Sequence, residues 1–276
     1  MRRSDLELDR RAFLKVGAMS AALATTPGAI AAQAGVALPL ITGGAVAAAP
    51  DRKIKKGSTV ETTSGKVRGE RVDDVEVFRG IPYGADTSGR NRFMPPTRPE
   101  PWGGTRETVE YGHIAPQTAS AGRIDYVRAI HWYDQPGGQS ENCLVLNVWT
   151  PDADNGKRPV IVCFHGGGYT SGSGNHNGFD GEIEARKQNA VCVSVNHRLG
   201  VLGFLYLAEI LGDEFAESGS VGMLDLHLAL EWVRDNIANF GGDPNRVMIY
   251  GQSGGGAKTT SLLGMQRAEG LFHAAA

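Results

Sequence analysis

The stretch "RVMIYGQSGGGAKTT", residues 246–260, joins an apolar run, a glycine-rich turn and a polar segment compatible with a helix. The run "RVMIY" predicts a strand buried on both faces. Two chemistries use such a strand–turn–helix unit: a loop that cradles phosphates, and a turn that presents a nucleophilic serine. The spacing of the residues distinguishes between them.

The phosphate-binding interpretation fails on spacing. A phosphate loop has the pattern G-x-x-x-x-G-K-[ST]. Counting from Gly251 brings the second glycine to Gly256, but Ala257 follows, and the lysine comes one position late at Lys258. One residue on a helix is a rotation of about 100° and a rise of about 1.5 Å. We therefore expect Lys258 to point away from any ligand of the loop, as a solvated helix residue.

The nucleophile interpretation fits the pattern G-x-S-x-G at "GQSGG", residues 251–255. In this pattern the serine sits on a strained turn, and small neighbours allow the backbone to fold sharply. Ser253 is then the candidate nucleophile. Five residues alone fit a plain glycine-rich turn equally well, so a second, independent feature is needed.

That second feature is "FHGGGY", residues 164–169, which directly follows the apolar run "PVIVC". Ester cleavage builds negative charge on the carbonyl oxygen. Backbone N–H groups reach that oxygen only where no side chain blocks the approach, and this explains consecutive glycines. His165 precedes the glycines, and we expect it to orient the loop structurally rather than to act as a general base.

The rest of the sequence predicts an α/β fold. Near-continuous apolar runs, typical of a parallel sheet covered on both faces, are "LVLNVWT", "PVIVCFH", "AVCVSVN" and "RVMIYG". A helix is predicted after Gly222, with an apolar stripe at Leu226, Leu230, Val233 and Ile237 and an end at "NFGGDP". Upstream, "STVETT", "KVRGERV" and "VEVFRGI" predict a small antiparallel meander. Prolines make residues 84–140 a long, ordered loop region.

Composition limits the possible partners. The chain has 276 residues, a net charge of -2 and no basic stripe, which argues against nucleic acid as a partner. Of three cysteines, Cys163 and Cys192 lie inside apolar runs, and we expect both thiols in the core. No metal spacing and no cofactor motif is present, so we expect neither a metal nor a cofactor.

Residues 1–49 form a separate segment, with the folded domain predicted from 50 to 276. Arg10 and Arg11 precede a weakly apolar run, residues 16–24, too short to span a bilayer. This resembles a bacterial twin-arginine signal and predicts export to the periplasm or the exterior without a stable membrane anchor. "AIA" at 29–31 and "AVA" at 45–47 both fit cleavage, and an amphipathic basic arm is the alternative.

Several separated motifs of this chain, in this order, are shared with one known family. They are "GIPYG" (80–84), "RFMPP" (92–96), "SENCLVLNVWTP" (140–151), "FHGGGY", "VNHRLG" (195–200) and "GLFH". On these, the chain from residue 58 resembles the N-terminal half of a type-B carboxylesterase, the cholinesterase-like group of α/β-hydrolases. The resemblance implies an α/β-hydrolase fold without its C-terminal strands, and a serine carboxylesterase acting on a small-molecule ester. It implies Ser253 as nucleophile, Gly167, Gly168 and Gly254 as oxyanion-hole amides, and a structural Arg92–Glu141 ion pair.

Three positions depart from that family's pattern. Gln252 stands where the family often has glutamate, His197 stands where it has tyrosine, and no cysteine near Pro116 is available to pair with Cys143. Gln252 removes a negative charge, which weakens the expectation of a cationic, choline-like substrate. Cys143 is expected to be a free thiol.

The catalytic partners of the serine are not found in this sequence. In this fold the acid and then the histidine follow the serine, yet only 23 residues follow Ser253. Glu269 and His273 lie there, four apart, and we do not expect them to be triad members. We expect a fragment or truncated gene, inactive and poorly soluble alone because the strand "RVMIY" lacks its next neighbour. A non-catalytic cholinesterase-like binding domain and an inactive fragment remain alternatives, and no oligomeric state is indicated.

Overall fold

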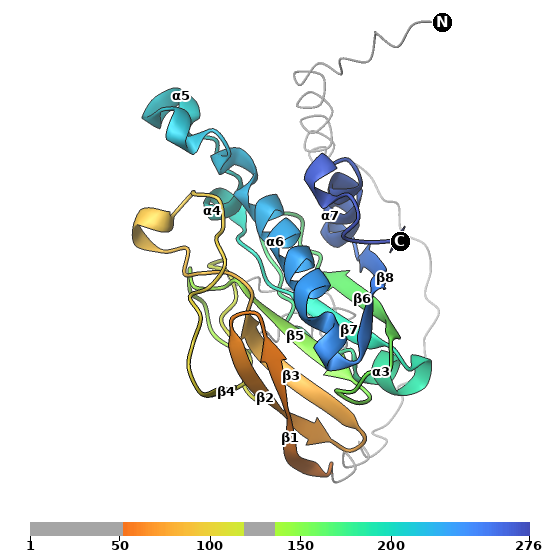
Figure 1. The fold of residues 1–276 in the computed structure, drawn as a ribbon. Helices are drawn as coiled ribbons and strands as arrows, with labels where there is room; N and C mark the ends of the chain where they lie inside the picture. The colour runs from red at the N-terminus through yellow and green to blue at the C-terminus, as the bar shows by residue number, and fades with distance from the viewer. Residues whose placement is uncertain (1–51, 119–135) are drawn as a thin grey trace, which may run out of the picture. The chain divides into compact units, whose positions relative to one another are not determined.

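A computed structural model describes residues 52–118 and 136–276 of the chain (Figure 1). The predicted export segment at residues 1–49 and the domain boundary after it lie outside the described residues, so both stay predictions. Within the described ranges, no helix combines the length and the apolar character needed to cross a bilayer.

The described residues form one mixed sheet of nine strands, ordered β1-β2-β3-β5-β7-β6-β8-β9, with β4 beside β2. The strands are β1 Ile54–Thr62, β2 Gly65–Val72, β3 Val75–Pro82, β4 Thr105–Glu107, β5 Val145–Thr150, β6 Arg158–Phe164, β7 Val191–Val195, β8 Gly242–Gly251 and β9 Ala274–Ala275. The α-helices are α3 Glu182–Gln188, α4 Gly200–Phe204, α5 Ala208–Leu211, α6 Val221–Asn236 and α7 Gly254–Leu263. Short 3-10 turns are η1 Gly89–Asn91, η2 Asn177–Phe179, η3 Asp213–Phe215, η4 Ser218–Ser220, η5 Ile237–Phe240 and η6 Gln266–Ala268.

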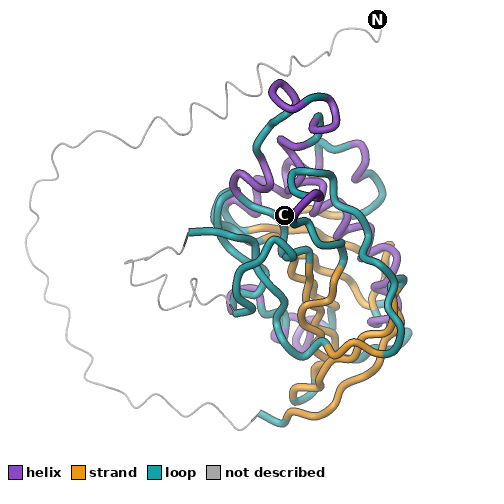
Figure 2. Tube along the Cα trace, turned by 90° about the vertical axis from the view of Figure 1, so that its left-hand side faces the viewer, coloured by secondary structure: helices purple, strands orange, loops and turns teal. Residues whose placement is uncertain are grey.

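The predicted antiparallel meander is confirmed as β1, β2 and β3. Tight turns join the strands, with Thr62 paired to Gly65 and Val72 paired to Val75. These strands lie at the lower end of the molecule in both views (Figure 1; Figure 2). The loop region after them contains β4, a short strand that the sequence did not predict and that pairs in parallel with β2.

Of the four apolar runs predicted to be parallel strands, one is not parallel to its neighbours. β6 pairs in parallel with β7 and with β8, as expected. β5, however, runs antiparallel to both of its neighbours, β3 and β7. Its six residues are all buried. An unbroken apolar run reports burial on both faces, and a central antiparallel strand has that property too.

Helices cover both faces of the sheet and give it two cores. Figure 1 shows α6 running across the front of the sheet. Val160, Val162 and Phe164 of β6 pack in the same core as α6, whereas Ile161 packs with the α3 core on the other face. This alternation is the period of a strand. Each buried valine or leucine stabilises the fold by roughly 1.5 to 3 kcal/mol.

The predicted helix after Gly222 is confirmed as α6. It continues as η5 and ends at Gly241, whose φ of 82° is the left-handed conformation of a helix C-terminus. The helix is buried on more than one stripe, because Asp225 and Trp232 are buried as well as the predicted apolar positions. At the far edge of the sheet, β8 pairs with the two-residue strand β9, so that edge is partly covered.

Candidate active site

Ser253 lies on the turn between β8 and α7, with φ of 55° and ψ of -118°. A non-glycine residue in such a conformation costs roughly 1 to 3 kcal/mol, and structures retain it where function requires it. The turn closes directly into the helix: the Gly255 N–H donates to the Gln252 carbonyl (2.9 Å) and the Ala257 N–H to the Ser253 carbonyl (3.3 Å). Ser253 itself is exposed.

Two glycines beside Ser253 let this turn touch the loop after β6. A Cβ on Gly254 would lie 2.5 Å from the backbone nitrogen and oxygen of Gly168. A Cβ on Gly255 would overlap the carbonyl oxygen of Phe164. Backbone therefore packs against backbone here, and only glycine leaves the necessary room.

The glycine loop, residues 165–169, follows directly from β6. Gly167 and Gly168 have φ of 88° and 64°, the left-handed region that glycine tolerates. The Gly167 carbonyl accepts from the N–H groups of Thr170 (3.3 Å) and Ser171 (3.2 Å). No hydrogen bond within residues 52–118 and 136–276 is donated by the N–H of Gly167, Gly168 or Gly254. These three predicted donors therefore lie on adjoining segments of backbone with no acceptor among the described residues.

His165 is buried beneath the loop and stacks on His197, with ring centroids 4.9 Å apart and planes at 10°. Its Nδ1 lies 2.8 Å from the Gly166 carbonyl oxygen. Burial, and then the nearby Lys258 cation, hold the pKa of both imidazoles well below the usual range. Both rings are therefore neutral, and the geometry agrees with a structural role for His165.

The prediction for Lys258 is wrong, because its side chain is fully buried. Its Nζ donates to the His165 carbonyl (2.9 Å) and lies 5.8 Å from the centroid of the Tyr169 ring. Burial lowers the pKa of this amine to about 7. Helical spacing was the missed signal, since one face of α7 packs inward: Gly254, Gly255, Lys258, Thr259 and Leu262.

Glu269 and His273 are not brought to Ser253. Glu269 is exposed. The Nδ1 of His273 accepts from the Val247 N–H (3.2 Å), and the His273 N–H donates to the Val247 carbonyl (2.7 Å). Val247 lies four residues before the end of β8 at Gly251, which is about 13 Å along the strand from the start of the serine turn. This placement agrees with the expectation that neither residue completes a triad with Ser253.

The predicted Arg92–Glu141 ion pair is present and is bidentate. Arg92 Nε donates to Glu141 Oε2 (2.6 Å) and Nη2 donates to Oε1 (2.5 Å). The pair ties together two loops that are 49 residues apart in sequence, in the geometry that suits arginine.

Sequence reasoning missed a second, buried pair between Arg198 and Asp225. Asp225 Oδ2 accepts from the Arg198 backbone N–H (3.0 Å) and Nε (2.9 Å), and Oδ1 accepts from Nη2 (2.6 Å). Arg198 Nη1 also donates to the Met94 carbonyl (2.8 Å). An aspartate inside the apolar run "GMLDLHLAL" was the available signal, because a buried carboxylate needs a partner.

The three cysteines are buried and free, which confirms the predicted burial of Cys163 and Cys192 and the predicted free thiol at Cys143. Burial raises the pKa of all three thiols, that of Cys163 to about 12. A thiol that stays protonated is neither a nucleophile nor a metal ligand. Within the described ranges, no three side chains of histidine, cysteine, aspartate or glutamate gather as a metal site.

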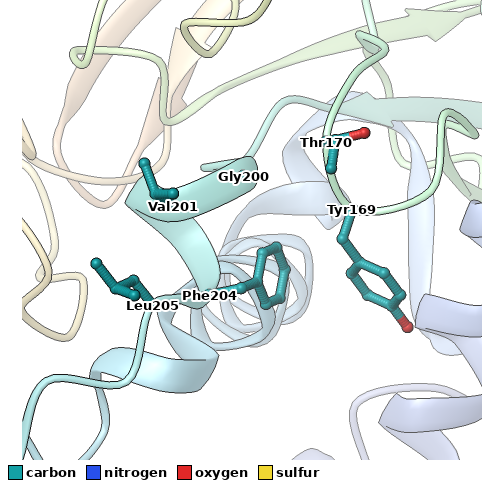
Figure 3. Close-up of a pocket in the computed structure, with 6 residues that line it drawn as sticks. All are labelled: Tyr169, Thr170, Gly200, Val201, Phe204 and Leu205. Atoms are coloured by element: carbon teal, nitrogen blue, oxygen red, sulfur yellow. The ribbon is translucent and has the colours of Figure 1, made fainter. Parts of the chain in front are cut away.

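An apolar pocket of about 320 Å³ begins one residue after Gly168 (Figure 3). Tyr169 and Phe204 meet edge to face across it, with ring centroids 5.0 Å apart. The Gly200 N–H donates a hydrogen bond to the Tyr169 carbonyl (2.7 Å). The pocket is lined by Tyr169, Thr170, Gly200, Val201, Phe204 and Leu205.

Comparison with known proteins extends over most of the chain. A model of the carboxylesterase family matches residues 56–276. The chain is 38% identical over 216 residues to para-nitrobenzyl esterase of Bacillus subtilis, and this covers 78% of the chain but 42% of the relative. It is 41% identical over 214 residues to phenmedipham hydrolase of Pseudarthrobacter oxydans, covering 78% of the chain and 41% of that protein. The chain thus spans about two fifths of the length of these relatives.

Solved structures of esterases also match most of this chain and less than half of their own length. The carboxylesterase EST55 of Geobacillus stearothermophilus superposes with a TM-score of 0.71 at 40% identity, covering 79% of this chain and 42% of that one. An esterase from Clostridium hathewayi that can hydrolyze aliphatic aromatic polyesters gives 0.74 at 39% identity, with 81% and 44% covered.

Proposed function

We propose, from the fact that the chain belongs to the carboxylesterase family and has an α/β-hydrolase fold, that the whole protein hydrolyses carboxylic esters through an acyl-enzyme on Ser253. The single observation that supports Ser253 best is the contact between the strained serine turn and the glycine loop. That contact sets a candidate nucleophile beside three backbone N–H groups that have no acceptor within the described residues.

The chemistry would proceed in two halves. Ser253 Oγ attacks the ester carbonyl carbon while a base takes its proton, and the carbonyl oxygen becomes an oxyanion. The N–H groups of Gly167, Gly168 and Gly254 would hold that oxyanion, and each such donor contributes roughly 100 to 1,000-fold in rate. The alcohol then leaves with a proton, and water attacks the acyl-enzyme to release the acid and restore the serine.

In this proposal the base and its orienting acid belong to a part of the protein outside residues 1–276. The family order is serine, acid, histidine, and His165 is buried and bound to the Gly166 carbonyl while His273 is bound to Val247. Relatives more than twice as long as the matched segment have room for both partners. Residues 1–276 by themselves would then lack esterase activity.

The proposed substrate is an uncharged ester. Gln252, at the turn, contributes no negative charge to attract a cation. The pocket from Tyr169 to Leu205 is apolar and fits an acyl or alcohol group of modest size.

The test uses the purified protein as its gene encodes it, with p-nitrophenyl acetate as substrate and a fluorophosphonate as a covalent label. Ser253→Ala should lose the label and reduce kcat by at least about 10,000-fold. Ser261→Ala, a second serine on α7 whose Oγ donates to the Ala257 carbonyl of its own helix, should keep both. Equal ester hydrolysis by Ser253→Ala and the unmodified protein would remove the nucleophile assignment, and absence of hydrolysis and of labelling in both would favour a non-catalytic binding domain.

Export remains a separate proposal that rests on Arg10 and Arg11. Replacing both by lysine should leave the protein in the cytoplasm of a bacterial host, as cell fractionation would show. Unchanged export would contradict a twin-arginine signal.

A further inference from the structure

Lys258 connects helix α7 to both ends of the glycine loop. Its side chain leaves α7 five residues after Ser253 and ends at the His165 carbonyl, 2.9 Å away. The same ammonium faces the Tyr169 ring at 5.8 Å, within the range of a cation–π contact. His165 and Tyr169 flank Gly166, Gly167 and Gly168. One buried group therefore contacts the loop where it begins and where it ends.

No carboxylate in the described part of the chain pairs with this cation. The titratable groups that interact with it are His165 and His197, both neutral, and the Arg198 cation beside His197 is already paired with Asp225. Burial of an amine without a carboxylate partner is unfavourable, and a methionine would fill similar space without that cost. Packing alone therefore does not account for a lysine here.

Besides its packing against Gly254 and Gly255 and the contact of His165 Nδ1 with the Gly166 carbonyl, the loop has few attachments that could keep its shape. The Gly167 carbonyl bonds locally, to Thr170 and Ser171, and the Tyr169 carbonyl is held by Gly200. The His165 carbonyl has Lys258 as its donor. Three consecutive glycines give the backbone unusual freedom, so the direction of their N–H groups depends on these attachments.

We propose that Lys258 is a positioning residue: it holds the glycine loop against α7, so that the N–H groups of Gly167 and Gly168 face the same point as that of Gly254. The inference rests on the proposed esterase function and deepens it. A displaced loop would still bind the ester through the apolar pocket but would stabilise the oxyanion poorly, so the loss should fall on kcat rather than on KM.

The experiment compares Lys258→Met with Thr259→Val in the purified protein as its gene encodes it. Thr259 is the buried neighbour on α7, and its hydroxyl donates to the Gly255 carbonyl of its own helix. Lys258→Met should lower kcat for p-nitrophenyl acetate by about 10 to 100-fold with KM changed less than about threefold. Affinity for an aryl trifluoromethyl ketone, which adds to serine and carries an oxyanion, should fall in parallel. Thr259→Val should keep all three values within about twofold.

A folded Lys258→Met protein with unchanged kcat and inhibitor affinity would overturn the inference. If that variant does not fold, Lys258→Gln decides, because its amide can donate to His165 without the charge; it should give an intermediate kcat, and an unchanged kcat would overturn the inference. Insoluble protein from both variants would also overturn it, since Lys258 would then be a folding determinant.

Failure of the proposed function would be recognised by a different result. The unmodified protein would lack esterase activity, or Ser253→Ala would retain it, and in either case the inference about Lys258 would be overturned too.

Discussion

Strand β6 runs between two regions that are held together in different ways. Along Val160 and Val162 the strand packs through apolar side chains against α6. From Phe164 onward the chain packs backbone to backbone, with Gly254 and Gly255 of the serine turn against the loop. The first region tolerates a lost methylene at a cost in stability, whereas the second has no room for an added methyl. The regions should therefore respond to mutation differently: a lost methylene in the first lowers stability and leaves catalysis unchanged, whereas an added methyl in the second disrupts the serine turn itself.

The largest effect is expected at Gly255. A Cβ there would overlap the Phe164 carbonyl oxygen, so Gly255→Ala should cost more than about 5 kcal/mol and leave little soluble protein. Gly256→Ala is the matched control, because its Cβ would meet only the Gly251 carbonyl oxygen at 3.3 Å. Soluble yield and thermal melting measure both. A Gly255→Ala protein that folds normally would show that the contact between the serine turn and the loop has room for a methyl group.

A core substitution should destabilise the protein less and should not change catalysis. Leu226 on α6 is fully buried, and Leu226→Ala should destabilise the protein by about 3 to 5 kcal/mol. The kcat of the molecules that remain folded should stay within about twofold, because the sheet rather than the loop absorbs the change. Urea unfolding and activity per labelled Ser253 measure the two quantities. A large drop in kcat would show that the sheet and the loop are not separable.

Lys258 should make the free energy of unfolding depend on pH. Burial lowers its pKa from the usual 10.5 to about 7, so between these values the unfolded chain binds more protons than the folded one. Stability from this group is therefore full above pH 10.5 and is lost as pH falls towards 7. Raising the pH from about 7 to about 9 should stabilise the unmodified protein by about 2 to 3 kcal/mol relative to Lys258→Met. Parallel urea titrations across that range test this, and a constant difference would contradict a buried, titrating lysine.

The smallest effect on the free energy of unfolding is expected at Ser253 itself. Glycine accepts φ of 55° without strain, so Ser253→Gly should raise the free energy of unfolding by about 1 kcal/mol while abolishing ester hydrolysis. Ser253→Ala is the control, because it removes the hydroxyl but keeps a Cβ at the strained position. Calorimetry that finds the two variants equally stable would mean that the turn stores no strain.

Local patterns predicted those parts of the molecule in which neighbours in sequence decide the structure. The meander follows from alternating residues and short turns, α6 from its helical period, and the serine turn from glycine spacing beside a strand. The direction of β5 could not be predicted, because two-sided burial looks the same in parallel and antiparallel strands. The short strand β4 was missed because its three residues are all exposed and have no apolar pattern.

Lys258, which was misassigned, and Asp225, which was missed, share a different cause. Lys258 and Asp225 are charged side chains on packed faces of helices, where hydropathy alone predicts exposure. Each is buried because a partner distant in sequence receives it: the His165 carbonyl for the lysine and Arg198 for the aspartate. Such partners become visible only in three dimensions, although a charge inside an apolar period marks where to look.

The contact of Arg198 with both Asp225 and Met94 also bears on the order in which the chain folds. Arg198 and Asp225 are 27 residues apart, whereas Arg198 and Met94 are 104 apart. Closing the longer loop costs about 1.2 kcal/mol more entropy than closing the shorter one. We therefore expect the guanidinium to reach its carboxylate first and the segment around Met94 to dock late, which makes that segment the first to open when the folded protein is handled near its melting temperature.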